Sequence, residues 1–314
     1  APSAGGSGAK ASTSSSGKTQ PREKKKKAPA PRVHLAADAF QRPSTKLSEG
    51  SKEFISATLF RGHPNIPKLV VDSIEKSYGD SEGFDKLTYI QEHTIPLIAK
   101  GSNVLAQAKA GSGKTVAYAV GILSKIDFTV KKPQAIIVCK SRELCQQQVQ
   151  VFKTLVACYP NGGEGVVRKV LPLTEYAKQN KGCDEAQRDR KPFTEQVIIC
   201  TAGRMKSKMD KKYDKKGDLS NHVKILVLDE ADALVGDKHT KEILKTLKKA
   251  AGKKNRKLQV ACFSATYSPE NLKEAFRTTG LKDGDEGVQL IKDTSNLVLK
   301  LVKQYTMYFE PRGE

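Results

Sequence analysis

Five short runs of β-branched and other apolar residues, with helical patterns between them, constrain the fold of this chain more than any other feature. The runs are apolar on both faces, so they predict parallel strands that helices cover on each side. Alternation of strands and helices predicts one three-layer α/β domain with a mostly parallel central sheet and right-handed crossovers. The predicted strands span residues 103–107, 135–139, 196–201, 224–229 and 258–265, and the helical patterns include residues 143–157 and 241–251.

The first 50 residues are rich in Ala, Gly, Ser, Pro and Lys and contain few large apolar side chains. Such a segment cannot bury enough apolar area to offset the entropy lost on ordering, so we expect a disordered basic tail. Eight basic residues precede position 33 against one acidic residue, Glu23, so about +7 of the net charge of +21 lies here. Two interpretations stay open: attachment to nucleic acid or nuclear import, and a solvated terminus without a specific partner.

Several classes of protein fit this sequence poorly. No apolar run approaches the roughly 20 residues of a membrane-spanning helix, and no apolar N-terminal segment is typical of a signal peptide. The cysteines show no CxxC spacing and mostly lie in apolar runs, which favours buried reduced thiols over zinc ligands or disulfides. They are Cys139, Cys145, Cys158, Cys183, Cys200 and Cys262.

The segment AKAGSGKT, residues 108–115, stands between a predicted strand and a predicted helix. Gly111 and Gly113 allow the backbone to turn its N–H groups toward a phosphate at a helix N-terminus. Lys114 then reaches the β- and γ-phosphates, and the Thr115 hydroxyl is placed to hold Mg²⁺. The strand, the Lys-Thr pair and the helix together favour a phosphate-binding loop over an ordinary turn.

The run ILVLDEAD, residues 225–232, ends a predicted buried strand with two carboxylates. The carboxyl edge of a parallel sheet is where ligands bind, so Asp229 is a candidate for Mg²⁺ through water. Glu230 is a candidate to orient or deprotonate an attacking water. The alternative is an acidic first turn of the next helix, which the helix dipole favours.

Two lysine-rich segments, residues 204–216 and 245–257, interrupt the pattern and are interpreted as surface insertions. A solvated charged surface and contacts with phosphates both remain possible for them.

The ordered motifs resemble those of DEAD-box RNA helicases. In sequence order they are GFDKLTYIQ (83–91), AKAGSGKT, SRELCQQ (141–147), TAGR (201–204), DEAD and SAT (264–266). The resemblance covers roughly residues 60–308 and implies the first of the family's two RecA-like P-loop domains. We therefore expect a tail at residues 1–50, a RecA-like domain at 51–309 and the start of a linker at 310–314.

The resemblance implies ATP and Mg²⁺ as cofactors. Gln91 is similar to the family's adenine-reading glutamine, whose amide can donate and accept at the N6/N7 edge. Phe60 is the candidate for stacking on adenine, with a core phenylalanine as the alternative. The implied cofactor-binding residues are Phe60, Phe84, Gln91, Ala108, Lys109, Ala110, Gly111, Ser112, Gly113, Lys114 and Thr115. The implied catalytic residues are Glu230, Lys114 and Asp229, and the implied metal ligands are Thr115 and Asp229.

The family grips the RNA backbone at positions that match two further motifs. These positions are Lys140, Ser141, Arg142, Thr201, Gly203 and Arg204, and Asp232, Ser264 and Thr266 are similar to the residues that couple hydrolysis to RNA grip. Backbone amides, hydroxyls and guanidinium groups suit phosphate and 2′-OH contacts. The sequence departs from the family where Lys140-Ser141 replaces Pro-Thr and where Ala202 and Leu87 replace prolines.

The resemblance implies an RNA-stimulated ATPase, either a helicase or an RNA clamp. The chain has no HRxGRxGR-like stretch, so we expect a second RecA-like domain to complete it and little turnover without that domain. Expected partners are RNA and possible protein activators, with no membrane, in the cytoplasm or nucleus. The basic N-terminal extension and KQYTMYF (303–309) resemble mRNA-export members at the nuclear pore. An idle RNA-binding scaffold and a DNA-directed P-loop ATPase are the alternatives.

Overall fold

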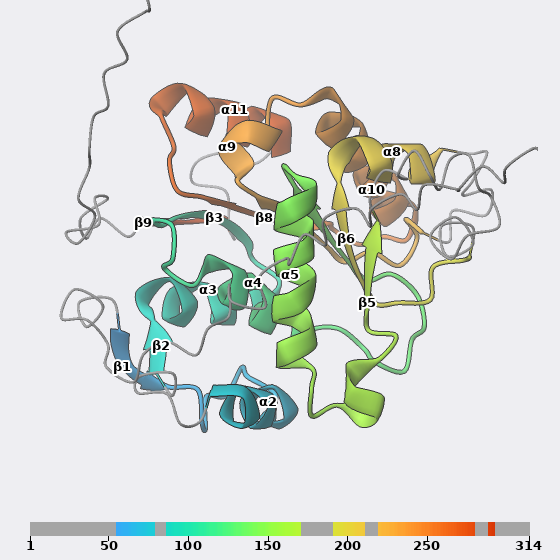
Figure 1. Ribbon diagram of the computed structural model, residues 1–314. Helices are drawn as coiled ribbons and strands as arrows, with labels where there is room; N and C mark the ends of the chain where they lie inside the picture. Colours follow the sequence, from blue (N-terminus) through green and yellow to red (C-terminus); the bar gives the residue numbers. More distant parts are fainter. Residues whose placement is uncertain (1–54, 79–85, 171–190, 211–218, 280–287, 293–314) are drawn as a thin grey trace, which may run out of the picture. The chain divides into compact units, whose positions relative to one another are not determined.

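The computed structural model of the protein describes residues 55–78, 86–170, 191–210, 219–279 and 288–292 (Figure 1). Within them, seven strands form one sheet in the order β5-β6-β4-β7-β8-β3-β9, and all neighbouring strands are parallel. The α/β class is therefore confirmed, and the five predicted strands are present. The strands are β3 (Asn103–Gln107), β4 (Ala135–Cys139), β5 (Val167–Val170), β6 (Val197–Thr201), β7 (Ile225–Asp229), β8 (Gln259–Ser264) and β9 (Val288–Lys292). A separate antiparallel pair joins β1 (Ile55–Leu59) to β2 (Lys86–Thr88).

Helices cover both faces of the large sheet (Figure 1). One layer holds α2 (Lys68–Tyr78), α3 (Tyr89–Lys100), α4 (Lys114–Leu123) and α5 (Arg142–Leu155), and a 3-10 turn, η2 (Pro160–Gly163), follows α5. The other layer holds α8 (Ala202–Met209), α9 (Ala231–Leu234), α10 (Lys238–Lys253) and α11 (Pro269–Thr279). The helical patterns predicted at 143–157 and 241–251 are confirmed as α5 and α10.

Side chains along each central strand alternate between two hydrophobic cores. In β4, Ile136 and Val138 join the core beneath α8–α11, whereas Ile137 joins the core beneath α2–α5. All three side chains are fully buried. Burial on both sides explains why the middles of these strands are apolar. Because the strands are parallel, the carboxyl ends of β3, β4, β6, β7 and β8 lie along one edge of the sheet.

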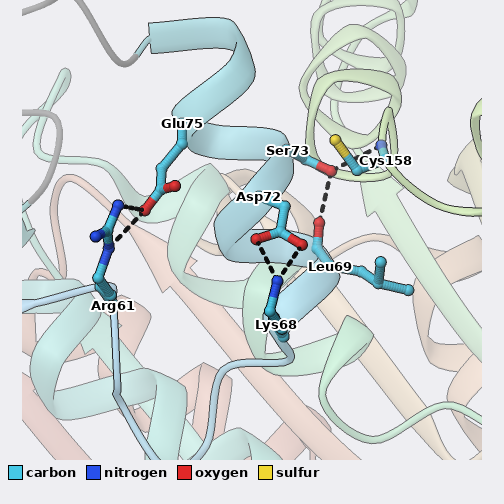
Figure 2. A network of polar contacts seen from close by, with 7 residues as sticks. All are labelled: Arg61, Lys68, Leu69, Asp72, Ser73, Glu75 and Cys158. Atoms are coloured by element: carbon cyan, nitrogen blue, oxygen red, sulfur yellow. Dashed lines mark hydrogen bonds and ion pairs between the residues drawn. The ribbon is translucent and has the colours of Figure 1, made fainter.

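Polar contacts fasten α2 to the end of α5, as Figure 2 shows. The Ser73 hydroxyl donates to the Leu69 carbonyl at 2.7 Å and accepts from the Cys158 backbone N–H at 3.0 Å. At the surface, Arg61 pairs with Glu75 at 2.7 Å. These contacts hold the segment just after Phe60 against the helical layer.

Burial of the cysteines agrees with the sequence for Cys139, Cys145, Cys200 and Cys262, whereas Cys158 is half-buried. All five of these thiols are free, and Cys183 lies outside the described residues. The described part of the chain contains no helix with the length and apolar character needed to cross a membrane.

The interpretation of both lysine-rich segments as surface insertions is wrong for the described parts. Residues 204–209 belong to α8 and residues 245–253 belong to α10. Both helices are anchored in the core, α8 by Met205 and α10 by Leu247, because apolar residues recur at helical spacing between the lysines. Residues 211–218, the predicted tail and the predicted linker lie outside the described residues.

Candidate active site

The glycine-rich loop joins β3 to α4 at the carboxyl edge of the sheet. Gly111 and Gly113 have φ angles of 76° and 88°, in the left-handed region that residues with a Cβ rarely adopt. A Cβ at Gly113 would also lie 2.4 Å from Nε2 of Gln91. Glycine at these positions lets the loop turn tightly into the N-terminus of α4, where the helix dipole favours an anion.

Lys114, the first residue of α4, folds back over this loop. Its Nζ donates hydrogen bonds to the Ala108 carbonyl at 2.6 Å and to the Lys109 carbonyl at 2.7 Å. Partial burial lowers the pKa of Lys114, and the charges of Asp229, Glu230 and Asp232 oppose that shift. The ammonium group therefore lies in a loop that faces three carboxylates.

The residues present fit a bound nucleotide phosphate. The Ser112 hydroxyl is buried, and no described residue forms a hydrogen bond with its Oγ. Burying a polar atom without a partner is costly, and a phosphate oxygen would supply one. The described residues contain no group of three or more His, Cys, Asp or Glu side chains that could hold a metal ion. A magnesium ion here would therefore need phosphate oxygens beside Thr115 and Asp229, as is usual for this ion.

Asp229 ends β7 and is 6% exposed. Burial raises its pKa to about 6, against the attraction of Lys114, and the neighbouring Glu230 raises it further. Gln148 of α5 donates a hydrogen bond to its Oδ2. Burial disfavours the charged form of this carboxylate, and a bound cation would stabilise that form.

Glu230 follows with φ 53° and ψ 53°, an unusual conformation for a residue that is not glycine. The left-handed region costs roughly 1–2 kcal/mol for such a residue. This left-handed conformation turns the chain sharply between β7 and α9. Strained residues of this kind cluster at functional sites because the surrounding structure must hold them.

The end of β8 is joined to α9 by hydroxyl groups. Ser264 Oγ donates to Oδ1 of Asp232 at 2.7 Å, and Thr266 Oγ1 donates to Oδ2 at 3.4 Å. The Thr266 backbone N–H also donates to Ser264 Oγ at 3.1 Å. The structure thus brings the three predicted coupling residues together, while their role in coupling stays a prediction.

Gln91 lies against the glycine-rich loop. Its Oε1 accepts from the Thr88 backbone N–H at 2.9 Å, and its Nε2 donates to the Gly113 carbonyl at 3.3 Å. The side chain is 5% exposed, so α3 is tied directly to the phosphate-binding loop. Phe60 is 6% exposed within the core, which leaves little of its ring for stacking on a base. The stacking role of Phe60 stays a prediction, and Phe84 lies outside the described residues.

The candidate RNA-binding residues begin the two helices that follow neighbouring strands. Cys139 of β4 and Thr201 of β6 are register partners, so both segments leave the sheet side by side. Ser141 caps α5 by accepting a hydrogen bond from the Leu144 backbone N–H at 3.2 Å. The exposed members are Lys140 and Arg142, and the half-buried members are Ser141, Thr201, Gly203 and Arg204.

Comparison with known proteins identifies the family. Residues 88–275 match the DEAD/DEAH box helicase family. The chain belongs to this family. A similar curated relative is the DEAD-box ATP-dependent RNA helicase 38 of Oryza sativa subsp. japonica, which is 31% identical over 273 residues. That match covers 82% of this chain and 47% of the relative. The chain spans about half or less of the curated relatives that it matches most clearly.

Solved DEAD-box structures share the fold. Mss116, bound to single-stranded RNA and UDP-BeF, matches with a TM-score of 0.59 and 22% identity over 75% of this chain and 45% of that one. S. cerevisiae Dbp5, bound to RNA and ADP BeF3, matches with a TM-score of 0.54 and 22% identity, and the match covers 72% of this chain and 50% of that one. These likenesses support the RecA-like three-layer architecture.

In this DEAD/DEAH-box domain, two buried polar residues beside Asp229 were not predicted from the sequence. They are Gln148 and Tyr118, which are 2% and 0% exposed. The Tyr118 hydroxyl donates to Gln148 Oε1, and Gln148 in turn donates to Asp229. One signal was present in the sequence, because Gln148 occupies a core position of α5 between Cys145 and Phe152.

Proposed function

We propose that this chain is the ATP-binding half of an ATP-dependent RNA helicase or RNA clamp. The observation that carries the proposal is the placement of Lys114 in the glycine-rich loop, within electrostatic reach of Asp229, Glu230 and Asp232. Membership of the DEAD/DEAH-box family supports the substrate class. A pure scaffold would have no use for a buried carboxylate opposite a loop lysine.

Each residue of the site has a role in this proposal. Lys114 binds the β- and γ-phosphates, and Thr115 and Asp229 hold Mg²⁺, Asp229 through water. When bound, the ion would supply positive charge that stabilises the charge developing on the phosphate groups. Glu230 accepts a proton from the attacking water. Gln91 reads the adenine edge, and Phe60 contributes no more than the small exposed part of its ring.

RNA binding is assigned to the starts of α5 and α8. Arg142 and Arg204 contact phosphates, and the hydroxyls of Ser141 and Thr201 suit phosphate or 2′-OH groups. We further propose that a second RecA-like domain closes over both ligands and contributes the arginine that stabilises the transition state. Such an arginine is worth roughly 10³–10⁵ in rate in related enzymes, so this chain alone would hydrolyse ATP slowly.

The first test is binding of a fluorescent ATP analogue with Mg²⁺, with hydrolysis measured in the presence and absence of single-stranded RNA. Binding with little turnover is expected. Lys114→Ala should abolish binding, whereas Lys100→Ala, at an exposed lysine of α3, should not. RNA binding by a chain that binds no nucleotide would favour the idle scaffold. Rapid RNA-stimulated turnover would contradict the need for a second domain.

Two further experiments address the catalytic step and the nucleic acid. In the protein completed by its second domain, Glu230→Gln should lower RNA-stimulated hydrolysis by roughly 10²–10⁴ while nucleotide binding persists. Unchanged turnover would remove Glu230 from the mechanism. Competition between RNA and DNA of the same sequence separates an RNA enzyme from a DNA-directed ATPase. Stronger competition by DNA than by RNA would favour the DNA-directed ATPase.

The cellular place is also part of the proposal. S. cerevisiae Dbp5 has been solved with Nup159 and Gle1, which supports testing a nuclear-pore location and a protein activator for this chain. Imaging of the tagged protein should show a nuclear rim signal, and a uniformly cytoplasmic signal would remove the mRNA-export assignment.

A further inference from the structure

The outer face of α10 carries a row of lysines, which Glu242 interrupts between Lys238 and Lys245. Steps of seven, four and four residues separate Lys238, Lys245, Lys249 and Lys253, so these side chains lie within about 80° of arc on one side of the helix. All four are exposed. Ile243, Leu244, Leu247 and Ala251 are buried on the opposite side. Exposed Lys241 and Lys248 widen the row, which we call the lysine face.

The lysine face contains one acidic residue, which lies between Lys238 and Lys245. Glu242 is the single acidic residue of α10, and it pairs with Lys206 of α8 at 3.1 Å. Lys241 pairs with Glu274 at 2.8 Å, but Lys238, Lys245, Lys249 and Lys253 form no ion pair with another described residue. Like charges four residues apart destabilise a helix, so a bound polyanion would relieve repulsion along this face.

The lysine face begins beside the candidate RNA-binding residues. A Cβ at Gly203 would lie 3.5 Å from Cδ2 of His239, so the starts of α8 and α10 are in close contact. The two helices pack side by side (Figure 1). From that contact, the 16 residues of α10 extend for about 24 Å. A strand held at Gly203 and Arg204 could therefore continue along the lysines.

We propose that the lysine face of α10 binds the phosphate backbone of RNA that extends beyond the contacts at the start of α8. The inference deepens the proposed function and rests on it. Lysine ammonium groups contact phosphates as point charges and do not read bases. The face therefore lengthens the RNA footprint and strengthens binding without adding sequence preference.

The experiment compares two charge-matched variants of the chain. One replaces Lys238, Lys245, Lys249 and Lys253 by Gln. The control makes the same change at four exposed lysines away from α10, which are Lys76, Lys100, Lys131 and Lys153. Each removes four positive charges. Fluorescence anisotropy measures affinity for single-stranded RNA of about 6 and about 20 nucleotides across a range of salt concentrations. Thermal unfolding of both variants checks that they fold, with an unchanged or higher midpoint expected for the α10 variant.

Each neutralised phosphate contributes about −0.7 to the slope of log affinity against log salt. For the longer RNA, the α10 variant should have a slope shallower by about 3 and at least about tenfold weaker binding at 0.1 M salt. The shorter RNA should be affected no more by the α10 variant than by the control. Equal behaviour of both variants on the longer RNA would overturn the inference.

The remaining outcomes separate this inference from the proposed function. If the wild-type chain binds neither the shorter nor the longer RNA, both the proposed RNA binding and the role of the lysine face are overturned. Wild-type binding that the α10 variant retains in full would overturn the lysine face alone. The wild-type chain could also bind polyglutamate more strongly than RNA and lose that binding in the α10 variant. This outcome would assign the lysine face to an acidic protein and contradict the proposal.

Discussion

Gln148 donates its side-chain amide to the buried carboxylate of Asp229, although 81 residues separate them in the sequence. Tyr118 completes a directional chain by donating its hydroxyl to the other end of the Gln148 amide. The three side chains come from α4, α5 and β7, and all are buried. Through these hydrogen bonds, Gln148 links α4 and α5 to the Asp229 carboxylate. Lys114 begins α4, and the candidate RNA-binding residues begin α5.

Replacing Gln148 by Leu tests whether this amide positions Asp229. Leucine fills a similar volume but removes the hydrogen bonds that Gln148 makes with the Asp229 carboxylate and the Tyr118 hydroxyl, at a cost of about 1–3 kcal/mol in the free energy of unfolding. We also expect the Mg²⁺ concentration needed for half-maximal binding of the ATP analogue to rise. Gln150→Leu, the same change on the exposed side of α5, is the control for both measurements. A loss of stability with unchanged Mg²⁺ dependence would limit Gln148 to a structural role.

Asp229→Asn should stabilise the nucleotide-free chain while weakening Mg²⁺-dependent nucleotide binding. Burial raises the pKa of Asp229 from 3.8 to about 6, a difference that corresponds to roughly 3 kcal/mol. Because the folded state holds the proton more tightly, wild-type stability falls as the pH rises from about 4 to about 6. The gain from asparagine should therefore be largest above pH 6 and vanish below about pH 4. Urea unfolding at several pH values measures it, and a less stable variant at pH 7.5 would contradict the argument.

Sequence patterns located the central strands because burial on both faces leaves their middle positions apolar. The edge strand β5 was not predicted because it is not buried on both faces and so contains polar residues. In β5, Arg168 and Lys169 interrupt the apolar pattern, and Lys169 is exposed. Loop and strand-end motifs located Lys114 and Asp229, since local geometry fixes those positions. Gln148 was missed because its partner is brought near only by tertiary packing of α5 against β7.

Gly113→Ala should destabilise the chain and weaken nucleotide binding. The positive φ of 88° costs about 1–2 kcal/mol with a Cβ, and the new atom would displace the Gln91 amide. Gly252→Ala is the matched comparison, because a Cβ there meets nothing within 4 Å on exposed α10. That substitution should raise the free energy of unfolding by up to about 1 kcal/mol. Chemical denaturation measures the change in the free energy of unfolding of each variant, which should be negative for Gly113→Ala and positive for Gly252→Ala. Equal changes would refute the special role of the loop geometry.

Ser264→Ala tests whether the bond to Asp232 carries coupling between nucleotide and RNA. The substitution removes the 2.7 Å hydrogen bond and the acceptor for the Thr266 N–H, while Ser264 itself lies outside the predicted nucleotide contacts. In the protein with both domains, we expect ATP-analogue affinity within about twofold of wild type and a coupling free energy between analogue and RNA reduced by about 1 kcal/mol or more. Titrating RNA with and without the analogue measures that coupling. Ser77→Ala, at an exposed position of α2, provides the control. Unchanged coupling in Ser264→Ala would show that this hydrogen bond only fastens β8 to α9.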